Sequence, residues 1–133
     1  MGLLKSTTVG VSVNRDPKTV YEFVSNLENL PRWAKVFCLS VKQLNGGWIV
    51  ETPQGPAKIR LVKRNHLGIL DHHVNTSPAV EVLVPMRVVP NGDGSEVMLT
   101  VFQTPDMSEE KFAEDIGVVE QDLKNLKHAL EKH

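Results

Sequence analysis

The first residues of the chain alternate between apolar and polar types. Val9, Val11 and Val13 occupy every second position, and small or polar residues lie between them. Successive side chains of a β-strand point to opposite faces, so the three valines share one face. The pattern therefore predicts a strand that buries one side only.

Helical spacing replaces this alternation after residue 15. Asp16 is a favourable N-cap, and Pro17 takes the first helical position, where its missing N–H costs no hydrogen bond. Apolar residues then recur on one helix face: Val20, Phe23, Val24 and Leu27. Pro31 predicts that this helix ends within residues 26–33, where a short second helical turn follows.

Six apolar segments that end in turn residues fill the middle of the chain. They are residues 34–44, 46–53, 55–65, 68–76, 79–89 and 95–104. The later breaks between them contain Gly or Pro together with Asn, Gln or Ser, which is typical of turns. Gly46 and Gly47 at the first break predict a β-hairpin. Sequential strands joined by short turns predict an antiparallel meander.

One long amphipathic helix is predicted at the end of the chain, over residues 108–132. Ser108 is a suitable N-cap, and Glu109 and Glu110 complement the positive end of the helix dipole. A single apolar stripe follows at helical spacing: Phe112, Ile116, Val119, Leu123, Leu126 and Leu130. Gly117 lies beside this stripe at a cost of about 1 kcal/mol relative to Ala, which we interpret as room for a close-packed strand or for a ligand.

The order of the elements predicts an α+β fold. A sheet of about seven strands with one apolar face needs a cover, and the C-terminal helix is the only predicted element long enough. A twisted sheet curves away from the helix that it wraps around. We therefore predict a gap between sheet and helix, which is a common position for a small-molecule site.

Composition and charge narrow the classes of partner. The chain has 133 residues, enough for one domain over residues 1–133. A formal net charge of -1 gives no overall attraction to nucleic acid or to an anionic membrane. Cys38 is the only cysteine, which excludes an intrachain disulfide and a Cys-rich zinc site. No segment has the length of a membrane span or signal peptide, and we expect a cytoplasmic protein without a cofactor.

Residues 13–37 resemble a known family. A strand leads there into a Pro-started helix with aromatic residues, then an Asn-rich turn and a Trp; the positions are Pro17, Val20, Tyr21, Phe23, Asn29, Pro31 and Trp33. This segment resembles the opening of the START/Bet v 1-like superfamily, also called SRPBCC, and is most similar to its polyketide cyclase/dehydrase-like group. The order of elements matches over nearly the full chain. The resemblance implies a helix-grip fold, in which a strongly curved antiparallel sheet surrounds a long C-terminal helix and leaves a cavity.

The resemblance implies no single reaction. Members of the superfamily include lipid carriers, hormone sensors, aromatase/cyclases, chaperone co-activators and oxygenase domains. An oxygenase is disfavoured, because the chain is too short for a separate Rieske cluster domain and has one cysteine.

Residues 68–74 hold an Asp and two adjacent His in an apolar run. On a strand, His72 shares a face with Leu70, whereas Asp71 and His73 lie on the other face. Because Leu70 on the same face is apolar, we predict that His72 points inward and that Asp71 and His73 point outward. The expected charge partners on the outer face are Lys58, Arg60 and Glu81. Because His72 and His73 point apart, they cannot share one ion, and no metal site is predicted.

His72 is the candidate for chemistry, and three roles are open. Burial keeps its imidazole neutral near pH 7, which suits a general base or a hydrogen-bond partner for the carbonyl or hydroxyl of a ligand. It can equally be a core residue with both nitrogens satisfied. No second inward titratable group stands out as its acid/base partner, which argues against an enzyme.

The preferred hypothesis is the binding of a small hydrophobic molecule, aromatic or acyl in character. The predicted cavity walls are Trp48, Ile59, Leu61, His72, Val84, Met86, Leu99 and Val101, closed by Ile116 and Val119. A polyketide cyclase, aromatase or dehydratase with His72 as general base is one alternative, and a protein-interaction module with a filled cavity is another. A cavity above about 300 Å³ with His72 on its wall favours binding, and an interior at normal packing density favours the interaction module.

Overall fold

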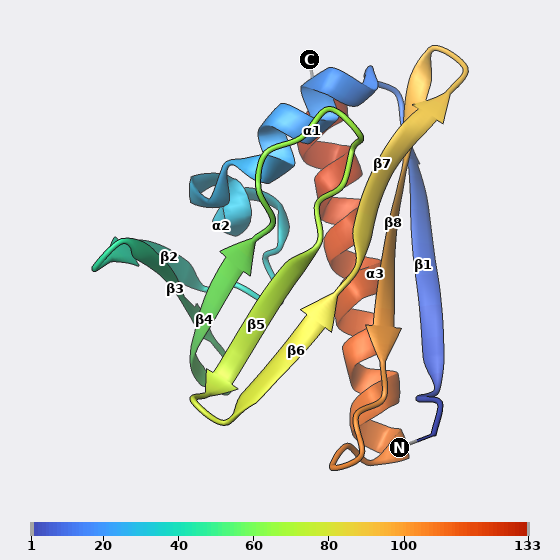
Figure 1. The fold of residues 1–133 in the computed structure, drawn as a ribbon. Coiled ribbons are helices and arrows are strands. Elements are labelled where there is room, and N and C mark those ends of the chain that lie inside the picture. The colour runs from blue at the N-terminus through green and yellow to red at the C-terminus, as the bar shows by residue number, and fades with distance from the viewer. Residues whose placement is uncertain (1, 133) are drawn as a thin grey trace.

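The computed structural model describes residues 2–132, in which antiparallel strands curve around a long C-terminal helix (Figure 1). The elements in chain order are β1 (Ser6–Val13), α1 (Pro17–Ser25), the 3-10 helix η1 (Leu27–Asn29), α2 (Leu30–Trp33), β2 (Ser40–Leu44), β3 (Gly47–Thr52), β4 (Gly55–Leu61), β5 (His72–Ser77), β6 (Val80–Val84), β7 (Met86–Asn91), β8 (Gly94–Phe102) and α3 (Glu109–Glu131). This arrangement confirms the predicted α+β helix-grip fold.

The strands form two hydrogen-bonded sheets, which we call ladders, and not the single sheet that the sequence predicts. One has the order β2-β3-β4-β5-β6, and the other has the order β1-β8-β7. The segment before β5 joins them, because Ile69 forms a bridge with Arg87 and the Leu70 N–H donates to the Met86 carbonyl at 2.9 Å. The two ladders therefore continue one another over one curved surface (Figure 1).

Pro85 divides residues 79–89, which the sequence predicts as one strand. β6 ends at Val84 and β7 begins at Met86, on either side of this proline. Proline has no N–H to donate to a ladder, although its carbonyl still accepts from the Thr100 N–H at 2.9 Å. Because β6 and β7 enter different ladders, the described residues contain one strand more than expected.

Residues 34–39 form a turn and not the start of a strand. β2 begins only at Ser40. The N–H groups of Val36 and Phe37 donate to the carboxylate of Asp122 in α3, at 2.9 and 3.1 Å. These donors are therefore not available to a neighbouring strand. The sequence pattern could not reveal this acceptor, which lies 86 residues away from Val36.

Asp122 is a buried carboxyl group on the packed side of α3, with 4% of its surface exposed. Loss of water raises the pKa of this carboxyl, while its hydrogen bonds from the 36–37 backbone and from Asn125 oppose the rise. Burial, together with nearby Asp122, also raises the pKa of the Cys38 thiol to about 11. A thiol with this pKa stays protonated at neutral pH, so Cys38 serves packing and not nucleophilic chemistry.

Helices α1 and α3 begin where the sequence predicts. The Asp16 carboxylate accepts from the Thr19 N–H at 3.1 Å, and the Ser108 hydroxyl accepts from the Lys111 N–H at 3.0 Å. Pro17 is the first residue of α1. Each cap satisfies one of the donors that a first helical turn leaves free.

Helix α3 is buried unevenly along its length. Its main neighbours are β1, β8 and α2. Leu123, Leu126 and Leu130 lie in its C-terminal half and are buried, whereas Ile116 and Val119 in the middle of the helix are partly exposed. In Figure 1 the turn between β5 and β6 lies away from α3. Phe112 at the start of the stripe is buried as well, so the predicted apolar stripe is buried at both ends and partly exposed in the middle.

Gly117 does not make room for a close-packed strand. It is exposed, and a Cβ added to it would meet no atom within 4 Å. The interpretation of this glycine as a strand contact is wrong, because its side of α3 faces open space.

Candidate functional site

The inner surface of β4, β5 and β6 is apolar and partly open to solvent. Strand register aligns two rows across it: Leu61, His72 and Val84, and then Ile59, Val74 and Val82. Of these six, only Ile59 is buried, and the other five are partly exposed. Helix α3 packs mainly on β1 and β8 and leaves this surface without a close cover. We call these six residues the open face.

A groove of about 580 Å³ begins at Ile59 and Leu61 of the open face and extends to Lys58 and Arg60 on the outer face of β4. It runs between the end of α1, η1, the turn from β2 to β3, and β4. Its lining includes Leu27, Leu44, Trp48, Ile49, Ile59 and Leu61, with the polar side chains of Ser25, Asn26, Asn45, Lys58, Arg60 and Asn75. The structure thus brings three predicted cavity residues, Trp48, Ile59 and Leu61, to one groove.

The other seven predicted cavity residues lie outside the lining of this groove. Five are partly exposed: His72, Val84, Val101, Ile116 and Val119. Met86 and Leu99 are register partners on β7 and β8 and are buried, with 1% and 7% of their surfaces exposed. These two residues therefore belong to the core beside the open face. A second pocket, of about 320 Å³ between α1 and the end of α3, contains none of the ten residues.

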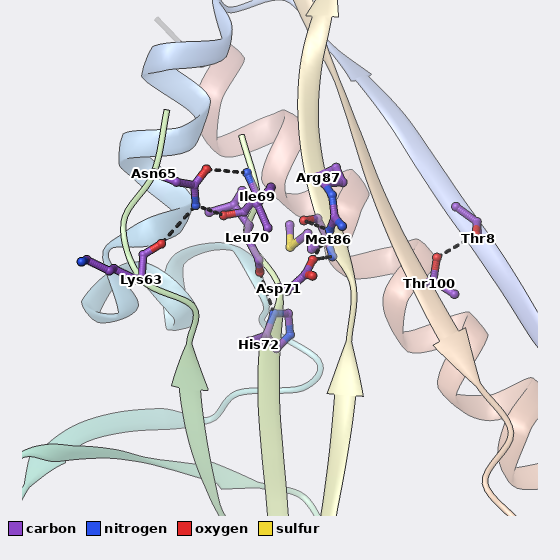
Figure 2. A network of polar contacts seen from close by, with 10 residues as sticks. All are labelled: Thr8, Lys63, Asn65, Ile69, Leu70, Asp71, His72, Met86, Arg87 and Thr100. Atoms are coloured by element: carbon purple, nitrogen blue, oxygen red, sulfur yellow. Dashed lines mark hydrogen bonds and ion pairs between the residues drawn. The ribbon is translucent and has the colours of Figure 1, made fainter. Parts of the chain in front are cut away.

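His72 points inward, as its apolar neighbours predict. It stands on the open face between Leu61 and Val84, and its Nδ1 lies 3.1 Å from the Leu70 carbonyl oxygen (Figure 2). Desolvation lowers the pKa of the imidazole, while the bond to Leu70 and the charge of Asp71 act in the opposite direction. The side chain is therefore predominantly neutral at pH 7.

Asp71 is a structural clamp between the two ladders. Its carboxylate accepts from the Met86 N–H at 2.9 Å and forms an ion pair with Arg87 (Figure 2). The prediction that Asp71 pairs with residues of the neighbouring β4 or β6 is wrong. Asp71 precedes β5 and lies beside the start of β7, so Arg87 is the cation within reach.

The expected charge ladder on the outer face forms without Asp71 or His73. Arg60 of β4 and Glu81 of β6 pair across β5 with an N–O distance of 3.3 Å. His73 lies in register between Arg60 and Leu83, and its buried Nδ1 has no hydrogen-bond partner in residues 2–132. His72 and His73 thus lie on opposite faces and share no site.

Asn65 holds the loop that leads into β5, a role that sequence reasoning missed. Its side-chain oxygen accepts from the N–H groups of Leu67 and Ile69 at 2.9 and 3.1 Å. Its amide nitrogen donates to the carbonyl groups of Lys63 and Ile69 at 3.1 and 2.9 Å (Figure 2). An Asn shortly before a Gly-containing turn is the signal that predicts such a network.

Strand parity could have extended the predicted site. Val74 and Val82 share the inward set with His72 and Val84, and the structure places all four on the open face. Leu27 and the turn at residues 44–47 also line the groove, but they come from distant parts of the chain. No local pattern in the sequence predicts that contact.

The described residues form neither a metal cluster nor a membrane-spanning helix. Within residues 2–132, no three His, Cys, Asp or Glu side chains lie together in a way that could hold a metal ion. No helix in the same range is long and apolar enough to cross a membrane.

The curved sheet, the C-terminal helix and the open face define a helix-grip protein. The chain belongs to the polyketide cyclase/dehydrase and lipid transport family, whose model matches residues 5–131. Solved structures share the fold. The protein XoxI from Bacillus cereus is 21% identical with a TM-score of 0.77, over 94% of this chain and 94% of that chain. A START superfamily protein from Mycobacterium smegmatis is 14% identical with a TM-score of 0.71, over 96% and 97%.

A third structure extends the likeness to the Bet v 1 branch. Ara h 8.0201 is 9% identical with a TM-score of 0.69, over 98% of this chain and 100% of that chain. These findings confirm the predicted resemblance to the START/Bet v 1-like superfamily and to its polyketide cyclase-like group. Among curated proteins, no sequence matches the chain.

Proposed function

We propose that the protein binds a small hydrophobic molecule, aromatic or acyl in character, against the open face. The observation that carries the proposal is the difference in burial between adjoining rows of residues. Met86 and Leu99 are closed off from water, whereas His72 and Val84 in the neighbouring row are partly exposed. A ligand that removes this apolar surface from water gains about 25 cal/mol per Å².

The groove and the family support this proposal. The groove's volume of about 580 Å³ falls within the range of about 300–1,000 Å³ that is typical of small-molecule pockets, but His72 is not on its wall, so only the volume part of the criterion stated for the sequence is met. Trp48 offers a flat apolar ring there for stacking. The family is described by polyketide cyclases, dehydrases and lipid transport, all of which concern hydrophobic molecules.

In this proposal the ten predicted residues have different positions around the ligand. Trp48, Ile59 and Leu61 hold one end of the ligand in the groove. His72 and Val84 lie under its other part, and Val101, Ile116 and Val119 face it from β8 and α3. Met86 and Leu99 support the floor from within the core and do not touch the ligand.

Catalysis by His72 as a general base has less support. Within residues 2–132, the only hydrogen-bond partner of its ring is the Leu70 carbonyl. The nearest carboxylate along the chain, Asp71, is on the other face of the strand and is paired with Arg87. A cyclase or dehydratase needs a second group that delivers or accepts a proton. The other alternative, a protein-interaction module with a filled cavity, requires the open face to be covered by the protein's own side chains. We therefore place ligand binding before both alternatives.

Two matched tryptophan variants test the proposal. The probe is N-phenyl-1-naphthylamine, titrated by its fluorescence. Val84→Trp fills the open face and is expected to weaken binding at least tenfold. Leu83→Trp adds the same side chain at the next position of β6, on the outer face, where Leu83 is 43% exposed; it should leave binding unchanged. Absence of binding to the wild type, or equal effects of the two variants, would contradict the proposal.

A further inference from the structure

His72 is the one polar side chain among the six residues of the open face. Leu61 and Val84 flank it in the same row, and the remaining three are Ile59, Val74 and Val82. A ligand that covers this row therefore meets one group that can form a directional hydrogen bond. The chemistry of that group decides which ligands are favoured.

The contact with Leu70 determines the tautomer of His72. Nδ1 lies 3.1 Å from the Leu70 carbonyl oxygen (Figure 2). A carbonyl oxygen can only accept a hydrogen bond, so Nδ1 carries the ring proton and donates it. In a neutral imidazole the other nitrogen, Nε2, is then unprotonated and is an acceptor only.

Nε2 is also available for bonding. No described residue in the range 2–132 donates to it. In this range, the buried ring nitrogens without a hydrogen-bond partner belong to Trp33 and His73. Nε2 of His72 also has no partner but is not one of these buried atoms, so it is in contact with solvent. It is an accessible acceptor without a protein partner, on an otherwise apolar surface.

The environment keeps His72 neutral, and Nε2 therefore unprotonated, near neutral pH. Desolvation disfavours the imidazolium and lowers the pKa of His72. The adjacent Asp71 carboxylate acts the other way, but it lies on the opposite face and is paired with Arg87. His73, the neighbouring titratable group along the strand, favours the neutral form of His72.

We infer that the ligand of the open face carries a hydroxyl or N–H group that donates a hydrogen bond to Nε2 of His72. This inference rests on the binding function proposed above and deepens it. Phenols and hydroxylated acyl or polycyclic molecules fit this class. A ligand that offers only a carbonyl or ether oxygen would place two acceptors against one another, and the desolvated Nε2 would stay without a partner.

A matched pair of probes tests the inference. 2-Naphthol has the donor, and 2-methoxynaphthalene replaces it with an ether on the same ring system. Isothermal titration at pH 7 gives the dissociation constants. We expect the wild type to bind 2-naphthol about 2- to 12-fold more tightly, which corresponds to the net value of one hydrogen bond.

Three variants locate the effect. His72→Leu should abolish the preference for 2-naphthol while it keeps the affinity for 2-methoxynaphthalene. His72→Gln retains an acceptor oxygen and should keep part of the preference. His73→Leu is the control on the opposite face and should keep all of it. Thermal melts of each variant establish that the fold is retained.

The outcomes separate this inference from the proposed function. A wild type that binds N-phenyl-1-naphthylamine but shows no preference for 2-naphthol overturns the inference and leaves the binding function standing. A preference that survives in His72→Leu, or that is lost equally in His73→Leu, also overturns it. A wild type that binds none of the three probes refutes both.

Discussion

Two neighbouring cross-strand pairs on the inner face of the sheet differ in burial. Met86 and Leu99 face each other across β7 and β8 and are buried, whereas His72 and Val84 face each other across β5 and β6 and remain partly exposed. Both pairs lie on the inner side of the curved surface. The difference comes from the helices that cover each pair: α3 packs on β8 and α1 packs on β7 and β8, whereas neither helix packs closely on β5 or β6. Alternation along a strand thus determines the inner face, but the positions of α1 and α3 determine which part of it is buried.

The largest expected effect is on the free energy of unfolding when the packed core is opened. Leu126→Ala removes a side chain with no exposed surface and should cost about 2–5 kcal/mol. Ile116→Ala, on the same stripe of α3 but partly exposed, should cost less than half as much, because its neighbours already leave space. Urea unfolding with a common m-value measures both.

Equal losses in these two variants would mean that the middle of α3 is packed as tightly as its end. The contrast between the buried end and the partly exposed middle of α3 would then be lost, and Ile116 would not be free to contact the proposed ligand.

Asp122 should give the next largest effect, with a dependence on pH. Asp122→Asn loses one of the acceptors for the N–H groups of Val36 and Phe37, at a cost of about 1–3 kcal/mol. Because the folded pKa of this carboxyl is raised above 3.8, the folded state binds more protons than the unfolded state just above that pH. Stability therefore falls as pH rises through this window and then levels off.

Asp122→Asn has no carboxyl group at this position, so its stability lacks this pH-dependent contribution. The advantage of the wild type over Asp122→Asn should accordingly be largest at low pH and shrink as pH rises, in urea unfolding series at several pH values. An advantage that is constant or grows with pH would show that burial does not dominate the titration of Asp122.

Asp71 should contribute less, because its partner Arg87 is partly exposed. Asp71→Ala removes the acceptor for the Met86 N–H and for the guanidinium, and we expect a loss of about 1–2 kcal/mol. The control is Glu81→Ala, which breaks the exposed pair with Arg60 and should cost about 0.2–1 kcal/mol. If the two variants lose equal stability, Asp71 is a surface ion pair and not a clamp between the ladders.

The sequence predicts most of the elements because their signals are local. Helical spacing, the N-caps at Asp16 and Ser108 and the alternation in strands all depend on residues within one or two turns. The direction of His72 could be predicted for the same reason. Pro85 shows the limit of this reasoning: its missing N–H is a local fact, but the division into two ladders depends on which strands lie on each side.

Contacts between distant segments could not be predicted. Asp122 accepts from a turn 86 residues away, and Asp71 pairs with Arg87 at the junction of the ladders. The groove likewise joins Leu27 to the turn near Trp48 and to Leu61. Each contact depends on the curvature of the sheet, which no single segment specifies. Eight of the ten predicted site residues are on strands and two are on α3, but only Trp48, Ile59 and Leu61 share one groove.

Substitution of two glycines by alanine is the last test of this contrast, and the two changes in stability are expected to have opposite signs. A Cβ at Gly117 would meet nothing within 4 Å, so Gly117→Ala should stabilise the protein by the helix propensity of Ala, about 0.8–1.0 kcal/mol. A Cβ at Gly94, at the start of β8, would lie 2.6 Å from the Val13 carbonyl oxygen, so Gly94→Ala must shift the backbone and lower the melting temperature. Thermal melts of the two variants give the signs directly. If Gly117→Ala lowers the melting temperature, another group packs against that side of α3, and the helix is covered where the structure leaves it open.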